Sequence, residues 1–501
     1  MLIRLSAGEG LSLQCQLFEQ LRGLILDGTL KCGERLPASR VLSEMLHISR
    51  NTVTLAYARL VDEGYVEMRE SVGTFVSAQI PDASLLTKVN SRTSARTAGG
   101  EERPQLAPHT VRAQTLLNPH RRRLIADFWV GRPDARSFPT KMWIKLIHNR
   151  LLSAGAALTE YKDPAGFGEL RQAIVDHLRP ARGIKATAEQ VIIVGGCQDG
   201  LNLVGRMLMP PTTTAVLEDP CYQGAAFLFE SLGARIHPIA VDAKGMITAR
   251  LPDQRRCIAY VTPSHQYPLG VTLSLDRRLE LIRWAAATDS YILEDDYDSD
   301  FRFNGPPIAA LKGLDGLDRV IYLGTFSKCL GAGLRLGHAL LPRGLVELAR
   351  ATKTLMNNGQ PWLEQAVLAD FMRSGAYQRH LRKIRQLYLS RRNALIKALE
   401  RHFGAVEILG GEAGMHVVWR LPDHLPCATE LEAIALAAGV GVYAVGSGGA
   451  VVLGTGSNND RHLVLGFSSL TEREIEAGIT RLAAALRGEA RSLAVAAEAV
   501  G

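Results

Sequence analysis

The sequence lacks several features that assign proteins to familiar classes. No run of about 18 or more apolar residues occurs, so we expect no segment that spans a membrane. Residues 1–6 show no pattern of a secretory signal peptide. None of the seven cysteines forms a CxxC pair, which argues against a zinc site and a disulfide framework. No internal repeat is found either. We therefore expect a protein of the reducing cytoplasm, with no partner in the membrane.

What the sequence does contain points to several domains and an anionic partner. A chain of 501 residues is too long for one ordinary core. Its 47% hydrophobic and 22% charged residues are typical of a globular protein. The net charge of +8 favours an anionic partner, and arginines gather in two places. They are Arg35, Arg40, Arg50, Arg59 and Arg69 near the N-terminus, and Arg121, Arg122 and Arg123 further on.

Residues 1–78 predict a winged helix-turn-helix domain. Leucine and isoleucine recur every three to four positions in residues 12–27, where Ser12 can cap the start of a helix and Gly28 its end. A short helix, a turn, a second helix and two short strands follow. Their expected bounds are Ser39–Leu46, His47–Ser49, Arg50–Glu63, Tyr65–Met68 and Thr74–Val76.

The start of the second helix of this pair is suited to contact bases of double-stranded DNA. Residues at this position of a helix-turn-helix reach the major groove, where Arg50 suits guanine and Asn51 suits adenine. Ser49 caps the helix. The other expected DNA-binding residues position phosphates or lie at the wing, and they are Ser39, Arg40, Thr52, Tyr57, Arg69 and Gly73. The alternative is a winged helix used for protein contacts, with these arginines solvated.

Five short motifs in this region resemble the GntR-type winged helix, across about residues 10–78. They are Leu36–Arg40, Ser49–Val53, Ala56–Tyr57, Glu63–Tyr65 and Gly73–Val76. The resemblance implies operator DNA as a partner. Residues 79–123 are rich in Ser, Thr, Arg, Gly and Pro and predict a flexible linker.

From residue 124 to about 490 the chain alternates strands with amphipathic helices, and residues 491–501 form a tail. Short apolar runs that end at Gly, Pro or acidic residues suit parallel strands buried on both faces. They are Val191–Val194, Thr214–Leu217, Ile258–Thr262, Tyr291–Leu293 and Val320–Leu323. We therefore expect an α/β domain.

Lys328 lies in a stretch suited to bind a phosphate-bearing aldehyde such as pyridoxal phosphate (PLP). Its amine would form the Schiff base with PLP, while Thr325, Ser327 and Arg335 would hold the phosphate. Asp295, 33 residues upstream, would pair with the pyridine nitrogen. We expect Tyr297 to contact the phenolic oxygen of PLP and Tyr222 to stack on its ring. The backbone amides of Gly196, Cys197 and Gln198 precede a helix that begins near Asp199, and they are expected to bind the phosphate. Alternatively, Asp295, Asp296 and Asp298 could hold a divalent cation.

The order of glycine turn, aromatic residue, acid with tyrosine, and lysine resembles fold-type I aminotransferases across residues 124–490. That resemblance implies a central, mostly parallel sheet, a smaller C-terminal α+β lobe, and a dimer in which Tyr161 approaches the PLP phosphate of the partner subunit. Taken together with the GntR-type winged helix of residues 1–78, the whole chain resembles MocR/GabR-type transcriptional regulators. Thr262–Pro268 and Glu294–Asp298 are similar to sequence motifs of that subfamily.

Two departures from the aminotransferase pattern argue against ordinary transamination. Tyr267–Gly270 replaces the usual Asn-Pro-Thr-Gly, and Val464 occupies the place of the arginine that clamps a substrate carboxylate. Cys197 and Cys329 are expected beside the cofactor, as packing residues rather than redox groups.

We therefore predict a PLP-dependent regulator, not an enzyme, that senses PLP itself, an amine or an amino acid. Two heads in a dimer imply two half-sites on one operator. One alternative is an active aminotransferase that carries a DNA-binding head, and another is a DNA-binding protein whose large domain has lost PLP. No resident metal is predicted.

Overall fold

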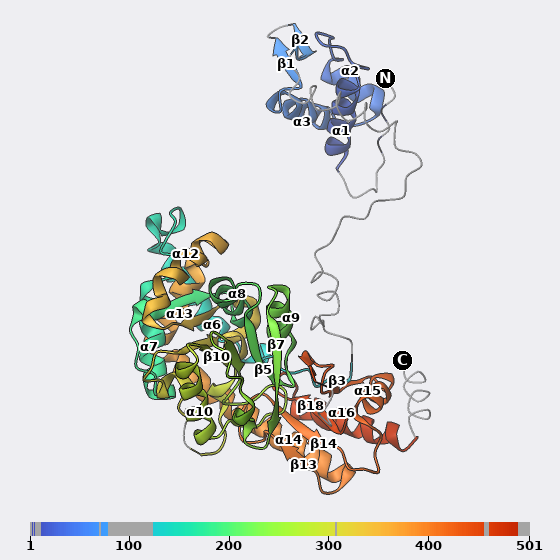
Figure 1. The fold of residues 1–501 in the computed structure, drawn as a ribbon. Coiled ribbons are helices and arrows are strands. Elements are labelled where there is room, and N and C mark those ends of the chain that lie inside the picture. The colour runs from blue at the N-terminus through green and yellow to red at the C-terminus, as the bar shows by residue number, and fades with distance from the viewer. Residues whose placement is uncertain are drawn as a thin grey trace, which may run out of the picture. The chain divides into compact units, whose positions relative to one another are not determined.

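The computed structural model describes residues 12–69, 72–78, 124–305, 308–454 and 460–488, along with two isolated positions near the N-terminus. The chain divides into two compact units, Met1–Gln105 and Leu106–Gly501. The predicted linker, the C-terminal tail and the cluster Arg121–Arg123 lie outside the described residues. Figure 1 shows the elements of each unit, which we describe separately.

The N-terminal unit, called the head below, is a winged helix-turn-helix whose element bounds agree with the sequence prediction to within one residue. Its elements are α1 (Leu13–Leu26), α2 (Ser39–Leu46), α3 (Arg50–Asp62), β1 (Val66–Arg69) and β2 (Gly73–Val76). Serine caps start two of the helices, because Ser12 Oγ accepts from the Cys15 amide and Ser49 Oγ from the Thr52 amide. The two strands form an antiparallel hairpin.

An eight-stranded sheet forms the centre of the second unit and contains all five strands predicted from the apolar runs. Its order is β4-β12-β11-β10-β9-β5-β7-β8, with parallel pairing from β11 through β7 and antiparallel pairing of β12 with both of its neighbours. The strands are β4 (Val191–Val194), β5 (Thr214–Asp219), β7 (Arg235–Asp242), β8 (Gly245–Met246), β9 (Ile258–Val261), β10 (Tyr291–Asp296), β11 (Val320–Thr325) and β12 (Gly337–Leu340).

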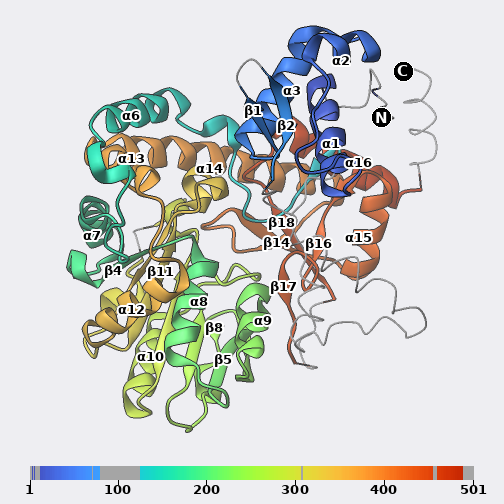
Figure 2. The ribbon, with the colours of Figure 1, turned by 90° about the horizontal axis from the view of Figure 1, so that it is seen from above.

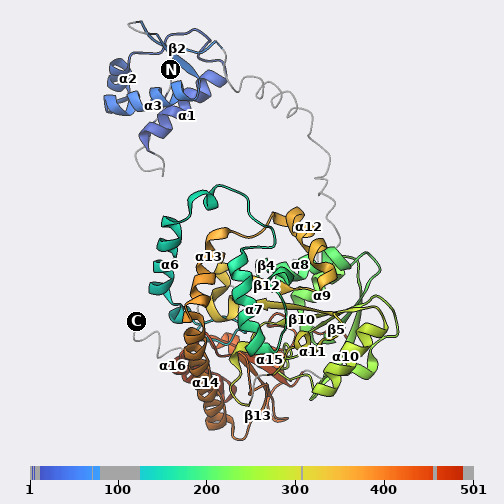
Figure 3. The same ribbon diagram turned by 90° about the vertical axis from the view of Figure 1, so that its left-hand side faces the viewer.

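Helices cover both faces of this sheet, as expected for strands that are apolar on both sides. One face packs against α8 (Cys197–Leu208), α9 (Gln223–Ser231) and α12 (Val346–Asn357). The other packs against α7 (Gly168–Arg182), α10 (Leu275–Ala287), α11 (Leu311–Leu314), α13 (Trp362–Arg373) and α14 (Ala376–Phe403). Figure 3 shows α13 beside α7 and α6 (Thr140–Leu152), which it contacts.

A smaller lobe follows α14 and confirms the expected α+β part. Its antiparallel sheet has the order β13-β14-β18-β16, and Figure 2 shows β14, β16 and β18 near α15 and α16. The elements are β13 (Glu407–Leu409), β14 (His416–Arg420), α15 (Ala428–Ala437), β16 (Tyr443–Ala444), β18 (His462–Gly466) and α16 (Glu472–Leu486). Two small ladders tie the lobe to earlier residues: β3 (Ala126–Asp127) with β15 (Val440–Gly441), and β6 (Cys221–Tyr222) with β17 (Ala450–Val451). Among the described helices, none has both the length and the apolar character needed to cross a bilayer.

Candidate functional site

A cavity of about 350 Å³ lies where β9, β10 and β11 end, and it gathers all the predicted cofactor-binding residues of the second unit except Tyr161. Those that line it are Gly196, Cys197, Gln198, Tyr222, Asp295, Tyr297, Thr325, Ser327, Lys328 and Arg335. The strands β9, β10 and β11 are parallel, so their carboxyl ends meet at one edge of the sheet. This shared edge brings together residues that lie far apart in the sequence.

Lys328 projects into this cavity from a turn of π-helix, Ser327–Gly331, that directly follows β11. Its Nζ donates to the carbonyl oxygen of Gly131, at 3.1 Å. Burial lowers the pKa of the Lys328 amine below its ordinary value, because a charged group loses hydration there. A lower pKa increases the fraction of neutral amine, which is the form that attacks an aldehyde.

Gly131 leaves room for the lysine, and a Gly131→Ala substitution is expected to remove it. A Cβ at this position would lie 2.6 Å from Lys328 Nζ, and the φ angle of +80° disfavours any side chain. We expect the variant to bind PLP at least about tenfold more weakly, in line with a loss of roughly 1.4 kcal/mol. Absorbance titration with PLP measures this directly.

Gly404→Ala is the matched control for this substitution. Gly404 has a φ angle of +79°, and a Cβ placed there would have no atom within 4 Å, so that variant has the backbone strain without a contact to Lys328. Equal PLP affinity in Gly131→Ala and wild-type protein would show that the lysine does not need this space.

Asp295 presents a buried carboxylate to the same cavity. Its Oδ1 accepts from the thiol of Cys197 at 3.0 Å and its Oδ2 accepts from the hydroxyl of Tyr260 at 3.0 Å. Burial raises the pKa of Asp295 to about 6. A cationic pyridine nitrogen would favour the ionised carboxylate, so the position suits the pairing predicted for PLP.

The part of the cavity that is predicted to hold the phosphate of PLP is formed by the start of a helix, two hydroxyls and a guanidinium. Helix α8 begins at Cys197, two residues before the predicted start, so the amide of Cys197 belongs to its first turn. Thr325 Oγ1 and Ser327 Oγ lie 3.0 Å apart. Gly196 faces the same place, since a Cβ built on it would lie 3.6 Å from Arg335 Nη1 and 3.8 Å from Ser327 Oγ, which are ordinary contact distances. Free amides at a helix start together with a guanidinium suit a phosphate.

Aromatic residues enclose the remainder of the cavity, and sequence reasoning missed several of them. Tyr222 was predicted, and its hydroxyl donates to Gln198 Oε1 at 3.2 Å. Tyr260, Tyr267 and Trp129 were not. Tyr260 could have been found from its position on β9, since β9 pairs with β10 near Asp295. Trp129 lies on no predicted strand next to Asp295, so its sequence position does not indicate that it lines the cavity.

Two expectations about neighbouring residues are corrected by the structure. Cys329 does not line the cavity but is buried in the core, with its sulfur 3.4 Å from the Tyr377 hydroxyl. Asp296 turns away from Asp295 and bonds Arg182 and Tyr322. Asp295 and Asp296 therefore do not converge on one cation, because neighbouring side chains of a strand point to opposite faces. Asp298 lies after the strand and bonds His265.

Val464 is a buried residue of the lobe sheet and clusters with Val130 and Val418. Among the described residues that line the cavity, Lys328 and Arg335 are the cationic ones. Within the described lining, therefore, no third cation occupies the place of the arginine clamp of aminotransferases.

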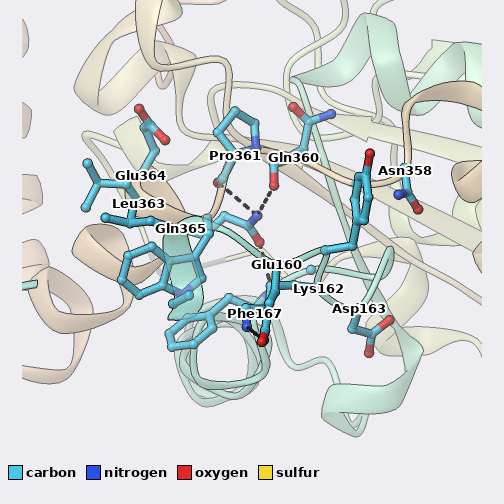
Figure 4. A pocket seen from close by; sticks show the side chains of 16 residues that line it. Glu160, Lys162, Asp163, Phe167, Asn358, Gln360, Pro361, Leu363, Glu364 and Gln365 are labelled. Carbon is cyan, nitrogen blue, oxygen red and sulfur yellow. Dashed lines mark hydrogen bonds and ion pairs between the residues drawn. The ribbon is translucent and has the colours of Figure 1, made fainter. Parts of the chain in front are cut away.

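Tyr161 lies apart, in a second cavity of about 300 Å³ formed by residues 157–167 and 358–365 (Figure 4). Its side chain is 89% exposed. Gln365 holds the two segments together, since its Oε1 accepts from the Phe167 amide and its Nε2 donates to the carbonyls of Gln360 and Pro361. Within its own chain, Tyr161 does not reach the cavity of Lys328.

In the head, most of the predicted DNA-binding residues gather around the start of α3. Arg50 and Asn51 are exposed, and Arg50 Nε lies 3.4 Å from the hydroxyl of Ser39. Ser49 Oγ lies 2.8 Å from the Thr52 hydroxyl. The other two arginines of the predicted DNA-binding set have partners of their own: Arg40 pairs with Glu44, and Arg69 pairs with Glu67 and stacks over Phe75. At the wing, Gly73 packs closely against the side chain of Arg35.

Tyr57 does not fit the predicted role in phosphate binding. It is 5% exposed and belongs to the core of the head, and its hydroxyl donates to the Pro37 carbonyl at 2.8 Å. Tyr57 therefore fixes α3 against the segment that precedes α2.

We expect Tyr57→Phe to lower the stability of the head by about 1 kcal/mol, since one hydrogen bond is lost and Pro37 keeps an unpaired carbonyl. Operator affinity should stay within about twofold of wild type. Urea denaturation and gel-shift titration measure the two quantities. A strong loss of operator affinity with unchanged stability would instead show that Tyr57 contacts DNA.

Comparison with known proteins assigns both units to families. Residues 13–76 match the gntR family of bacterial regulatory proteins, and residues 130–482 match aminotransferase class I and II. The probable rhizopine catabolism regulatory protein MocR of Rhizobium meliloti is 37% identical, over 81% of each chain. The HTH-type transcriptional regulator TauR of Rhodobacter capsulatus is 34% identical, over 96% of this chain and 97% of its own. The Pyrococcus horikoshii kynurenine aminotransferase structure, a complex with PMP, has a TM-score of 0.65 and 26% identity, covering 81% of this chain and 99% of that one.

A GntR winged helix-turn-helix joined to an aminotransferase-like unit defines a class of DNA-binding transcriptional regulators. The chain belongs to this class, as the MocR-type member of the GntR family that the sequence motifs predicted. The α/β fold with a fold-type I aminotransferase-like unit is confirmed as well.

Proposed function

We propose that this regulator binds PLP at Lys328 and changes its binding to operator DNA when PLP, an amine or an amino acid occupies the cavity. The observation that carries the proposal is the position of Lys328, Asp295 and Arg335 around one cavity. When bound, PLP supplies an aldehyde for the lysine and an electron-withdrawing ring.

The residues of the cavity would then divide the work of holding the cofactor. Lys328 binds it covalently, and Asp295 keeps the ring nitrogen protonated. The start of α8 with Thr325, Ser327 and Arg335 holds the phosphate, and Tyr222 and Tyr297 contact the ring. An effector shifts the regulator only if it binds one conformation of the protein better than another.

The assembly that we propose is a homodimer in the bacterial cytoplasm, with two heads on two half-sites of one operator. The head is residues 1–78, residues 79–123 link it to the aminotransferase-like unit, residues 124–490, and residues 491–501 form the tail. Tyr161 supports a dimer, because an exposed tyrosine that does not line the cavity of Lys328 in its own chain suits contact with a partner subunit.

An active aminotransferase that carries a DNA-binding head is the second candidate. The solved aminotransferases of the same fold favour it. The buried Val464 argues against it, since a substrate carboxylate would lack its usual guanidinium. Relatives named as regulators, which match 81% and 96% of this chain, also favour the first candidate.

The visible absorbance spectrum of the purified protein distinguishes these candidates. A visible band that moves when an amine is added and then stays in place supports a sensor. Conversion of the band with accumulation of a keto acid identifies an enzyme. A protein that stays colourless when PLP is added contradicts the proposal and favours a unit that has lost PLP.

A further inference from the structure

A buried cluster behind the cofactor cavity joins the large sheet to the C-terminal lobe. It consists of His265 from the loop after β9, Asp298 from the loop after β10, and His416 at the start of β14. The three residues are no more than 3% exposed, and none of them lines the cavity. Buried ionisable groups are costly unless they are paired, so this arrangement calls for an explanation.

His265 connects the cluster to a residue that does line the cavity. Its Nδ1 lies 2.8 Å from Asp298 Oδ2 and 3.3 Å from the hydroxyl of Tyr297. A carboxylate only accepts hydrogen bonds, so the Nδ1 proton is donated toward Asp298 and also faces the oxygen of Tyr297. Burial raises the pKa of Tyr297 well above its usual value, which keeps the phenol protonated. Asp298 also lies within hydrogen-bonding reach of the Tyr297 hydroxyl and helps to raise its pKa. His265 donates to the same carboxylate, so it competes with the phenol for this acceptor and leaves the phenol proton for an acceptor in the cavity.

His416 fixes the ring of His265 from the side of the lobe. The two ring centroids lie 4.5 Å apart, and His416 Nε2 lies 3.0 Å from the carbonyl oxygen of Pro268. Burial holds the pKa of His416 well below its usual value, so its ring stays neutral beside His265. Gly414 makes the approach possible: a Cβ there would lie 2.2 Å from His265 Nδ1 and 2.5 Å from Asp298 Oδ2.

We propose that His265 is a positioning residue which, held by Asp298 and His416, directs the hydroxyl of Tyr297 toward the phenolic oxygen of bound PLP. This inference rests on the proposed function, because it requires PLP at Lys328. A hydroxyl donated to the phenolic oxygen lowers the basicity of the lysine–cofactor linkage. The other titratable side chains around Tyr297 are Tyr267, Asp295 and Lys328.

The test is a pH titration of the visible absorbance of the PLP-loaded protein. Loss of a hydrogen bond of about 1.4 kcal/mol would raise the midpoint by about one pH unit. We expect this rise in Tyr297→Phe, in His265→Gln and in Asp298→Asn. The double variant Tyr297→Phe/His265→Gln should show no greater rise than Tyr297→Phe alone, because His265 acts through that hydroxyl. His462→Gln, which removes an imidazole elsewhere in the lobe, should leave the midpoint unchanged.

Three results would overturn the inference. The first is an unchanged midpoint in His265→Gln, with the shift of Tyr297→Phe intact. The second is additive shifts in the double variant, which indicate an effect that does not pass through Tyr297. The third is a stoichiometric metal ion in wild-type protein that His265→Gln loses, since the cluster residues would then be metal ligands. If His265→Gln fails to fold, Asp298→Asn and its double variant with Tyr297→Phe carry the same test. A colourless wild-type protein overturns the proposed function itself.

Discussion

We expect a Lys328→Ala variant to stay colourless when PLP is added and to lose every effector-dependent change in operator binding. The reason is chemical: Lys328 supplies the amine in the cavity, and alanine leaves the aldehyde of PLP without a covalent partner. The variant should still fold, because among the described residues the amine of Lys328 has one hydrogen bond, to Gly131, and no ion pair. Absorbance spectra and gel shifts with and without effector measure both expectations.

Lys328→Arg is the control that separates the amine from its positive charge. A guanidinium keeps the charge but does not attack an aldehyde at neutral pH, so this variant should be as colourless as Lys328→Ala. An effector response like that of wild-type protein in either variant would show that the regulator does not work through covalent PLP. Operator binding without effector should persist in both.

We expect Arg50→Ala to weaken operator binding by about 1–3 kcal/mol, which is roughly a five- to 150-fold loss of affinity. Arg50 stands exposed at the start of α3, where a helix-turn-helix meets the edges of the bases. Its Nε contact to Ser39 is long, at 3.4 Å, and leaves the guanidinium available for a base. Gel-shift titration at fixed salt concentration measures the loss.

Two further substitutions give this experiment its controls. Arg50→Lys keeps the charge but not the paired donors, so it should discriminate less between operator and unrelated DNA. Arg59→Ala removes the same charge near the other end of α3, where Arg59 pairs with Glu63, and should cost much less affinity. Equal affinities of Arg50→Ala and wild type would exclude Arg50 as a base-reading residue.

The bounds of the head could be predicted because local signals mark them. Ser12 and Ser49 each precede a run of helical periodicity, and the structure shows both as caps. The burial of Tyr57 was not expected from a residue proposed to position a phosphate, although the sequence carries a signal for it. Tyr57 follows Val53 by four residues and precedes Leu60 by three, so the three share one face of the helix, and that face is buried.

The candidate site could be predicted in its composition but not in its contacts. Short motifs mark Asp295 and Lys328, and their positions after adjacent parallel strands follow from the fold. The contacts with Gly131 and His265 depend on segments far away in the sequence. Such pairs are fixed by packing, and without an alignment the single sequence holds no signal for them.

The strand order of the large sheet has a consequence for how the chain folds during synthesis. Strand β4, entirely apolar and buried, has β12 as its neighbour in the sheet, and β12 leaves the ribosome much later. The contacts of the head are local, so this domain can fold early in translation. Nascent chains therefore pass through a stage with a folded head and an unpaired β4, which is when aggregation and chaperone binding compete with sheet assembly.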